Sequence, residues 1–242
     1  IGNGIIPAAI EMIDALTMNA VERVTPSGYP NDAGAVLLIE IEGLAEEVDD
    51  ISGEVEATLW ETGSTEVRLA DNSDDREKLW KARKGALGAL GSLAPNYYLV
   101  DGVVPRTRLA EVLDLVGQIS EKHGLPIANV FHAGDGNLHP CILFDEREPG
   151  SVERAMEAGA EILKVCVDVG GTLTGEHGVG LEKKAYMHLV FTDEDMDAMK
   201  NVRKAFAPFN LFNPGKIFPG GPEYDRDIQR KAVASIGSGA YI

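Results

Sequence analysis

The sequence predicts an α+β fold in which an antiparallel sheet carries helices on one face. Strand-like and helix-like segments alternate along the 242 residues, a pattern that fits this fold or a doubly wound parallel sheet. The segment 128–144, ANVFHAGDGNLHPCILF, reads as two strands joined by a tight glycine-rich turn. Such a hairpin is antiparallel, so it favours the first architecture. Because no internal repeat or clear linker interrupts the chain, residues 1–242 are expected to form a single domain.

Each expected element follows from a local pattern. Residues 7–14 suit either a strand or the start of a helix, since periodicity cannot decide for so short a run. Ser73, Ser151 and Thr192 are predicted N-caps, and Gly124 is a predicted helix-ending glycine. Helical spacing predicts helices over 16–24, 45–63 with a break at Gly53, 73–90, 108–124, 151–171 and 192–210. Strands are expected at 34–43, 65–70 and 96–105, a turn-rich tail at 210–227, and flexible residues at 235–242.

Composition excludes several classes of function. The formal net charge of −17 disfavours nucleic acid and polybasic membrane contacts, because phosphates select basic surfaces. It does not exclude small anionic substrates, since a local cluster of cations can outweigh distant charge. No run approaches the roughly 20 apolar residues of a membrane span. The first residues lack the features of a signal peptide and resemble the interior of a longer protein. Two unpatterned cysteines, Cys141 and Cys166, predict a reducing cytoplasmic compartment.

Two histidines stand on either side of the glycine-rich turn. His132 is expected to close one strand and His139 to open the next, with positive φ at Gly134 and Gly136. Side chains at such positions can share one face, and neutral imidazole is a common ligand for zinc, manganese and iron. The alternative is an ordinary hairpin with two polar residues near its turn.

A second motif, GGTLTGEHGVG, supplies a carboxylate and another histidine. Glu176 follows Gly175 directly, and Gly178 comes two residues later. Such glycines let the backbone approach a crowded site. Two histidines with one carboxylate form a recurrent metal site with open positions. His177 suits proton acceptance, because its unperturbed pKa of about 6.5 lies near neutrality. A loop histidine bonded to the backbone is the alternative.

Other polar residues give weaker signals. The guanidinium of Arg83 can bind a carboxylate through two parallel hydrogen bonds, although a solvated basic helix face is the more common explanation. Asp101 is interpreted as a strand-end turn residue, and Cys141 as a small buried side chain. His123 and His188 stand near helix ends and are interpreted as structural.

The motifs taken together resemble one known family. IPAAIEMID, ANVFHAGDGNLHPCILFD, GGTLTGEHGVG and LFNPGKIFP occur in the order found in the C-terminal half of FAD-linked 2-hydroxyacid oxidases, such as glycolate oxidase and D-lactate dehydrogenase. The resemblance covers all but about the last dozen residues and extends to the vanillyl-alcohol oxidase group. It implies a substrate-binding cap with an antiparallel sheet that is ferredoxin-like in part. It also implies an N-terminal FAD-binding domain that this sequence lacks.

The resemblance assigns roles residue by residue. His132, His139 and Glu176 would hold a divalent metal, zinc or manganese, and His177 would take the proton of the substrate's hydroxyl while hydride passes to the flavin. Arg83 would pair with the substrate's carboxylate. Two residues of the NPGK segment, Asn213 and Lys216, would approach the FAD. Small 2-hydroxyacids, the FAD domain and iron–sulfur subunits are the implied partners, in the cytoplasm or peripheral to a membrane through those subunits.

Departures from the pattern narrow the expected substrate. Relatives that act on longer diacids have lysine where this chain has Leu99, and asparagine where it has Cys141. A small monocarboxylate such as glycolate or D-lactate therefore fits better. Two other readings remain open on the residues alone: a stand-alone metal-dependent hydrolase, and a non-catalytic domain that binds partner subunits. The isolated chain is expected to be inactive as an oxidoreductase.

Overall fold

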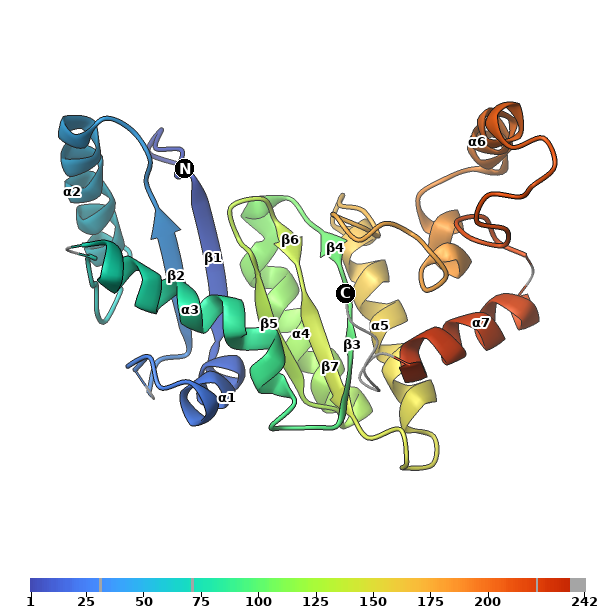
Figure 1. Cartoon of the computed structure of the whole chain (residues 1–242), viewed down its shortest axis with the longest axis horizontal. Coiled ribbons are helices and arrows are strands. Elements are labelled where there is room, and N and C mark those ends of the chain that lie inside the picture. Colours follow the sequence, from blue (N-terminus) through green and yellow to red (C-terminus); the bar gives the residue numbers. More distant parts are fainter. Residues whose placement is uncertain (31, 71, 221, 236–242) are drawn as a thin grey trace. The chain divides into compact units, whose positions relative to one another are not determined.

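The computed structural model describes residues 1–30, 32–70, 72–220 and 222–235, and it confirms the α+β class (Figure 1). Antiparallel strands with helices packed against them make up the described chain. Residue contacts divide it into two compact units, and the single domain expected over residues 1–242 stays a prediction. The first unit is Ile1–Leu93 with Ala128–Asp135, and the second is Ala94–Ile127 with Gly136–Ile242.

In the first unit, strand β1 lies between two antiparallel neighbours. β1 pairs with β2 on one side and with β5 on the other. The register sets Glu11 directly opposite His132, and Ile13 opposite Val130. The side chains of Ile13, Val130 and Phe131 are all buried. The strand bounds are β1 Ala9–Asp14, β2 Ala35–Glu40 and β5 Ile127–His132.

The helices of the first unit are α1 Ala15–Val24, α2 Ala45–Glu61 and α3 Ser73–Leu90. Asp14 caps α1 by accepting from the Thr17 N–H at 2.8 Å, and its other oxygen accepts from the Asn129 N–H at 2.7 Å. One carboxylate therefore fixes the start of α1 against β5. α1 and α3 pack together, and α3 buries the small residues Ala82, Ala86 and Ala89.

The second unit contains four short strands in two antiparallel pairs, β3 with β7 and β4 with β6. Asp101 falls in the break between β3 and β4, where the chain leaves one pair for the other. Its backbone neighbours Val100 and Gly102 are buried. The bounds are β3 Asn96–Leu99, β4 Gly102–Val103, β6 Asn137–Leu138 and β7 Pro140–Phe144.

Helix α5 is the main support of these strands, packing against β3, β4 and β7, with α4 alongside it (Figure 1). Gly159 makes this packing possible, because a Cβ there would lie 2.4 Å from the Tyr98 ring. Gly124 ends α4 with φ of 62°, as the sequence predicted. The helices are α4 Leu109–His123, α5 Ser151–Asp168, α6 Asp193–Phe206 and α7 Pro222–Ser235, with 3₁₀ turns at Arg106–Arg108 and Lys184–Leu189.

Several local predictions need correction. Residues 66–70 form no strand, and α2 continues through Gly53 without a break. The N-caps of α3 and α5 are Asn72 and Gly150, one residue before the serines expected. Part of the tail expected to be turn-rich is helix α7. The residues expected to be flexible fall almost entirely in 236–242, outside the described residues.

The glycine-rich turn agrees with its prediction in outline. β5 ends at His132 and β6 begins at Asn137, so His132 closes a strand, and His139 directly precedes β7. Of the two glycines, only Gly136 has positive φ, at 71°. The chain passes from the first unit to the second within this turn. Among the described residues, none of the helices has the length and apolar character that crossing a membrane requires.

Candidate active site

In the second unit, His139 and Glu176 approach each other directly. His139 is buried between β6 and β7, and its Nε2 lies 3.0 Å from Oε1 of Glu176. The Glu176 side chain is half exposed. An imidazole nitrogen and a carboxylate oxygen at this separation are a donor set that suits a divalent transition metal. Both predicted ligands of this unit therefore converge.

A close backbone contact brings Glu176 to this position. A Cβ on Gly175 would lie 2.3 Å from Oδ1 of Asn137, so only glycine allows the loop to approach β6 so closely. Asn137 in turn donates from Nδ2 to Oε1 of Glu176 at 3.3 Å. The sequence predicted close approach at Gly175, but not the part played by Asn137.

His177 lies against the same histidine. Its ring stacks on the ring of His139, with centroids 5.0 Å apart and planes inclined by 26°. Burial lowers the pKa of His177, and although the carboxylate of Asp101 opposes this effect, the net direction is down. A neutral imidazole, able to accept a proton, is therefore favoured at neutral pH.

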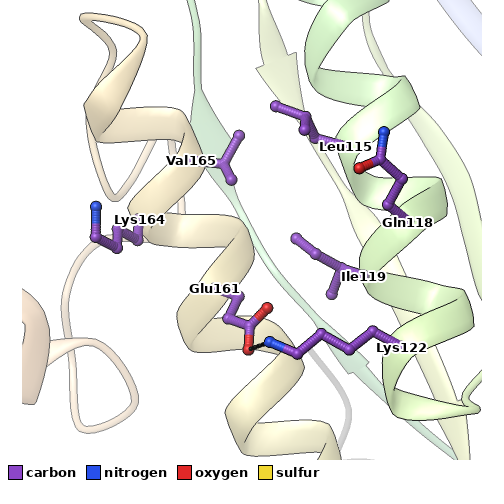
Figure 2. A pocket seen from close by; sticks show the side chains of 7 residues that line it. All are labelled: Leu115, Gln118, Ile119, Lys122, Glu161, Lys164 and Val165. Atoms are coloured by element: carbon purple, nitrogen blue, oxygen red, sulfur yellow. Dashed lines mark hydrogen bonds and ion pairs between the residues drawn. The ribbon is translucent and has the colours of Figure 1, made fainter.

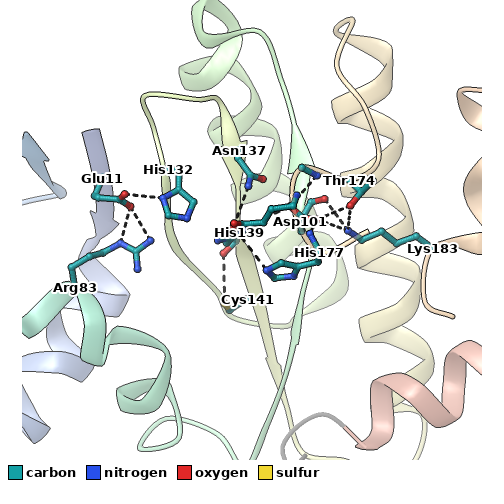
Figure 3. A network of polar contacts seen from close by, with 12 residues as sticks. Glu11, Arg83, Asp101, His132, Asn137, His139, Cys141, Thr174, His177 and Lys183 are labelled. Atoms are coloured by element: carbon teal, nitrogen blue, oxygen red, sulfur yellow. Dashed lines mark hydrogen bonds and ion pairs between the residues drawn. The ribbon is translucent and has the colours of Figure 1, made fainter. Parts of the chain in front are cut away.

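The loop that carries Glu176 and His177 is bonded to Asp101 (Figure 3). This fully buried carboxylate also lies 2.8 Å from Nζ of Lys183, which is itself buried. Burial alone would raise the pKa of Asp101, but His139, Lys183 and Thr174 outweigh it and hold the pKa well below its ordinary range. Asp101 is charged throughout the physiological range. The sequence interpretation of Asp101 as a turn residue missed these contacts.

In the first unit, Glu11 holds two of the predicted site residues (Figure 3). Its Oε1 lies 2.7 Å from Nδ1 of His132, and its Oε2 accepts from Nε of Arg83 at 2.9 Å. A histidine that donates Nδ1–H to a carboxylate presents the lone pair of Nε2 outward, which is the arrangement of metal-binding histidines. Arg83 is therefore no solvated surface residue, since its side chain is only 13% exposed. Glu11 gave no local signal in the sequence.

Asn213 and Lys216 lie exposed in the loop after α6. Arg203 fixes this loop by donating to the backbone oxygens of Phe212, Asn213 and Lys216 at 2.8, 2.7 and 3.0 Å. Asn213 adopts a positive φ of 45°, which asparagine tolerates better than most residues.

The predicted residues thus fall into two groups. His139, Glu176 and His177 come together in the second unit, and His132 and Arg83 share Glu11 in the first. The three proposed ligands, His132, His139 and Glu176, are divided between the units. That all three bind one metal ion therefore stays a prediction.

The weaker candidates have structural contacts. Cys141 is buried, and its Sγ contacts the backbone oxygen of His139 at 3.5 Å. His123 pairs with Glu161 at 3.1 Å, and His188 with the Ala185 oxygen at 2.8 Å.

A pocket of about 310 Å³ lies elsewhere in the second unit, between α4 and α5 (Figure 2). Its walls are mainly apolar, with an ion pair of Lys122 and Glu161 at 2.5 Å at one side. None of the predicted site residues lines it. It lies where two amphipathic helices pack together, apart from the predicted site.

Comparison with known families decides the relationship. The family described as FAD linked oxidases, C-terminal domain, matches residues 1–217. The chain belongs to this family. The match includes every predicted site residue, from Arg83 to Lys216.

Curated relatives of the family agree. The chain is 45% identical over 219 residues to the glycolate oxidase subunit GlcD of Escherichia coli K12, covering 90% of this chain and 44% of the relative. It is 38% identical over 230 residues to the GlcD subunit of Bacillus subtilis, covering 95% and 48%. A mitochondrial D-lactate dehydrogenase [cytochrome] of Arabidopsis thaliana is 29% identical over 222 residues, covering 90% and 38%. The chain thus spans about half the length of the curated relatives it matches, or less.

A solved structure supports the fold. The 4-ethylphenol oxidase of Gulosibacter chungangensis superposes with a TM-score of 0.60 at 17% identity, covering 91% of this chain and 49% of that one. At this identity the likeness concerns the fold alone.

Proposed function

We propose that this chain is the substrate- and metal-binding cap of an FAD-dependent 2-hydroxyacid dehydrogenase that converts glycolate or D-lactate to the 2-oxoacid. The observation that carries the proposal is its 45% identity to a glycolate oxidase subunit over 90% of its length. In this proposal the FAD-binding half of the protein supplies the flavin. The small monocarboxylate is favoured by Leu99 and Cys141, which add no polar contact for a second carboxylate.

The proposed metal ligands are His132, His139 and Glu176, with zinc or manganese as the ion. The contact of His139 with Glu176 and the Glu11 contact of His132 support this donor set. A bound divalent ion would act as a Lewis acid on the substrate's hydroxyl oxygen.

The remaining roles belong to the chain's own side chains. His177, with its lowered pKa, would accept the proton of the substrate's hydroxyl, and the flavin would supply the hydride acceptor. Arg83, whose Nε and Nη2 both pair with Glu11, would use its Nη1 N–H groups for the substrate's carboxylate. Asn213 and Lys216 would help to hold the flavin from the loop that Arg203 bonds.

The proposed partners are a small 2-hydroxyacid, the FAD-binding domain and iron–sulfur subunits. The relatives named as subunits of glycolate oxidase favour an assembly of several chains. A cytoplasmic location, or one peripheral to a membrane through partner subunits, is proposed because the sequence has only two cysteines, with no disulfide pattern in their spacing.

Anaerobic flavin reduction by the complete protein tests the proposal. Glycolate or D-lactate should bleach the flavin, L-lactate should do so much more slowly, and His177→Gln should slow bleaching about 10²–10⁴-fold. His188→Gln is the matched control, because His188 bonds only a backbone oxygen in its own 3₁₀ turn. If no 2-hydroxyacid bleaches the flavin, the proposal is wrong. Chelator-sensitive ester hydrolysis by this chain alone would favour a hydrolase instead.

A further inference from the structure

We propose that Asp101 is the positioning residue of the active site, the buried anion that fixes the loop bearing Glu176 and His177. The inference rests on the proposed function for the roles of those two residues. The contacts that hold the loop are features of the second unit itself (Figure 3).

Three consecutive backbone N–H groups point at this one carboxylate. Gly175 and Glu176 donate to Oδ1 of Asp101 at 3.0 and 3.2 Å, and His177 donates to Oδ2 at 3.0 Å. Successive N–H groups that converge in this way form an anion-binding nest. Here the anion is a side chain of the protein, so the loop is held without any ligand.

A second set of donors keeps the anion in place. Thr174 donates its hydroxyl to Oδ2 at 2.8 Å, and Lys183 donates to the same oxygen at 2.8 Å. Lys183 also bonds the backbone oxygen of Asp101 at 3.0 Å and the Thr174 hydroxyl at 3.1 Å. A buried carboxylate needs such compensation, because removing a charge from water is costly unless it is paired and hydrogen-bonded.

The fixed backbone determines where two side chains point. With the 175–177 peptides oriented by Asp101, Glu176 reaches Nε2 of His139 at 3.0 Å and the His177 ring stacks on the His139 ring. Gly175 has little room to shift toward β6, because even an added Cβ would lie 2.3 Å from Oδ1 of Asn137. One carboxylate therefore sets the position of a proposed metal ligand and of the proposed base together.

The test compares two equally buried ion pairs formed by adjacent lysines. Asp101→Asn alters the pair with Lys183, and Asp225→Asn alters the pair of Asp225 with Lys184, also 2.8 Å apart and buried. Asp225 accepts from the backbone N–H of Gly220 with both oxygens. Both variants should lower the melting temperature. Only Asp101→Asn should speed amide hydrogen exchange at 175–177 and weaken zinc or manganese binding, by about 10–100-fold.

Thr174 provides a milder variant, because replacing it removes one hydroxyl but leaves both charges of the ion pair in place. Thr174→Val should shift exchange and metal affinity in the same direction by a smaller factor, and Thr174→Ser should restore both because it keeps the hydroxyl. If Asp101→Asn and Asp225→Asn lower stability alike and leave loop exchange unchanged, Asp101 is only a structural residue and the inference is wrong. If the parent binds neither metal, the proposed metal site fails, while the exchange comparison still decides the role of Asp101.

Discussion

Glu11 holds two side chains that lie far apart in the sequence. Because β1 and β5 pair with Glu11 opposite His132, one carboxylate oxygen reaches the imidazole while the other reaches Arg83 on α3. The geometry fixes the tautomer of His132 and the direction of the guanidinium at once. Both side chains are thereby preorganised before any ligand arrives.

Replacing Glu11 by glutamine should release the histidine. The amide can no longer accept from both His132 and Arg83, so the Nδ1–H tautomer of His132 should lose its preference and metal affinity should fall about 10-fold or more. NMR chemical shifts of the imidazole nitrogens and calorimetric titration with zinc measure these effects. Glu40→Gln is the control, because Glu40 pairs with an exposed Arg76. Unchanged tautomer populations in Glu11→Gln would contradict the assignment.

The buried thiol of Cys166 should be unreactive in the native protein. Burial raises the pKa of Cys166 to about 12, so at about pH 8 only about 10⁻⁴ of it is thiolate. Reaction with Ellman's reagent should be slow in buffer and rapid in urea, where the thiol regains its ordinary pKa. A Cys141→Ala background isolates the signal. Rapid labelling of that variant without denaturant would show that Cys166 is accessible.

The sequence supplied part of this residue-level picture. It singled out candidates because histidines and carboxylates among glycines stand out locally, and these were His132, His139, Glu176, His177 and Arg83. Glu11, Asp101 and Asn137 did not stand out, since their partners are brought near only by strand pairing and loop packing. Residues that position others have no pattern of their own.

At the scale of elements, the contact of α5 with β3 depends on one missing side chain. Gly159→Ala would place a Cβ 2.4 Å from Cε1 of Tyr98, whose side chain is fully buried. We expect a loss of about 1–3 kcal/mol in unfolding free energy, as for other overpacked cores. Chemical denaturation measures it.

Gly117→Ala is the matched control in the neighbouring helix α4. A Cβ there meets nothing within 4 Å, so removing glycine from an exposed helix position should stabilise by about 0.5–1 kcal/mol. The two substitutions should therefore have opposite signs. The same sign for both would mean that the Tyr98 ring moves aside without cost.

Elements were predictable where caps and periodicity coincide. Thr192 caps α6, because its hydroxyl oxygen accepts from the Asp195 N–H at 3.2 Å, and Gly124 ends α4. Both were predicted. Residues 65–70 alternate like a strand but find no pairing partner, and alternation alone does not make a strand. α7 escaped prediction because the glycines and prolines before it resemble a loop.

At the scale of the whole molecule, the chain passes between its two units three times, after Leu93, Ile127 and Asp135. No linker marks these passages, and one of them falls inside the residues of β5, which is why the sequence predicted a single domain. The first unit takes its third strand from a distant segment. Composition cannot reveal such an arrangement.

The first unit should fold only when it contains that strand. Residues 1–93 alone lack Val130 and Phe131 of the core and the antiparallel neighbour of β1. Residues 1–93 joined through a flexible linker to 128–135 restore both. We expect cooperative thermal unfolding by circular dichroism for the joined chain and none for residues 1–93. Equal cooperativity in both would show that β5 is dispensable for this unit.

Because β5 comes later in the chain than the rest of the first unit, it is also the last strand of that unit to be synthesised. While a ribosome makes residues 94–135, at about 5–20 residues per second, β1 has left the exit tunnel with one edge paired to β2 and the other open. For about 2–8 s at that rate, this open edge is available to any extended segment nearby, including that of a neighbouring nascent chain. Translation speed between Leu93 and Asp135 is therefore a determinant of yield, and synonymous codons that slow this stretch would increase aggregation without changing a single residue.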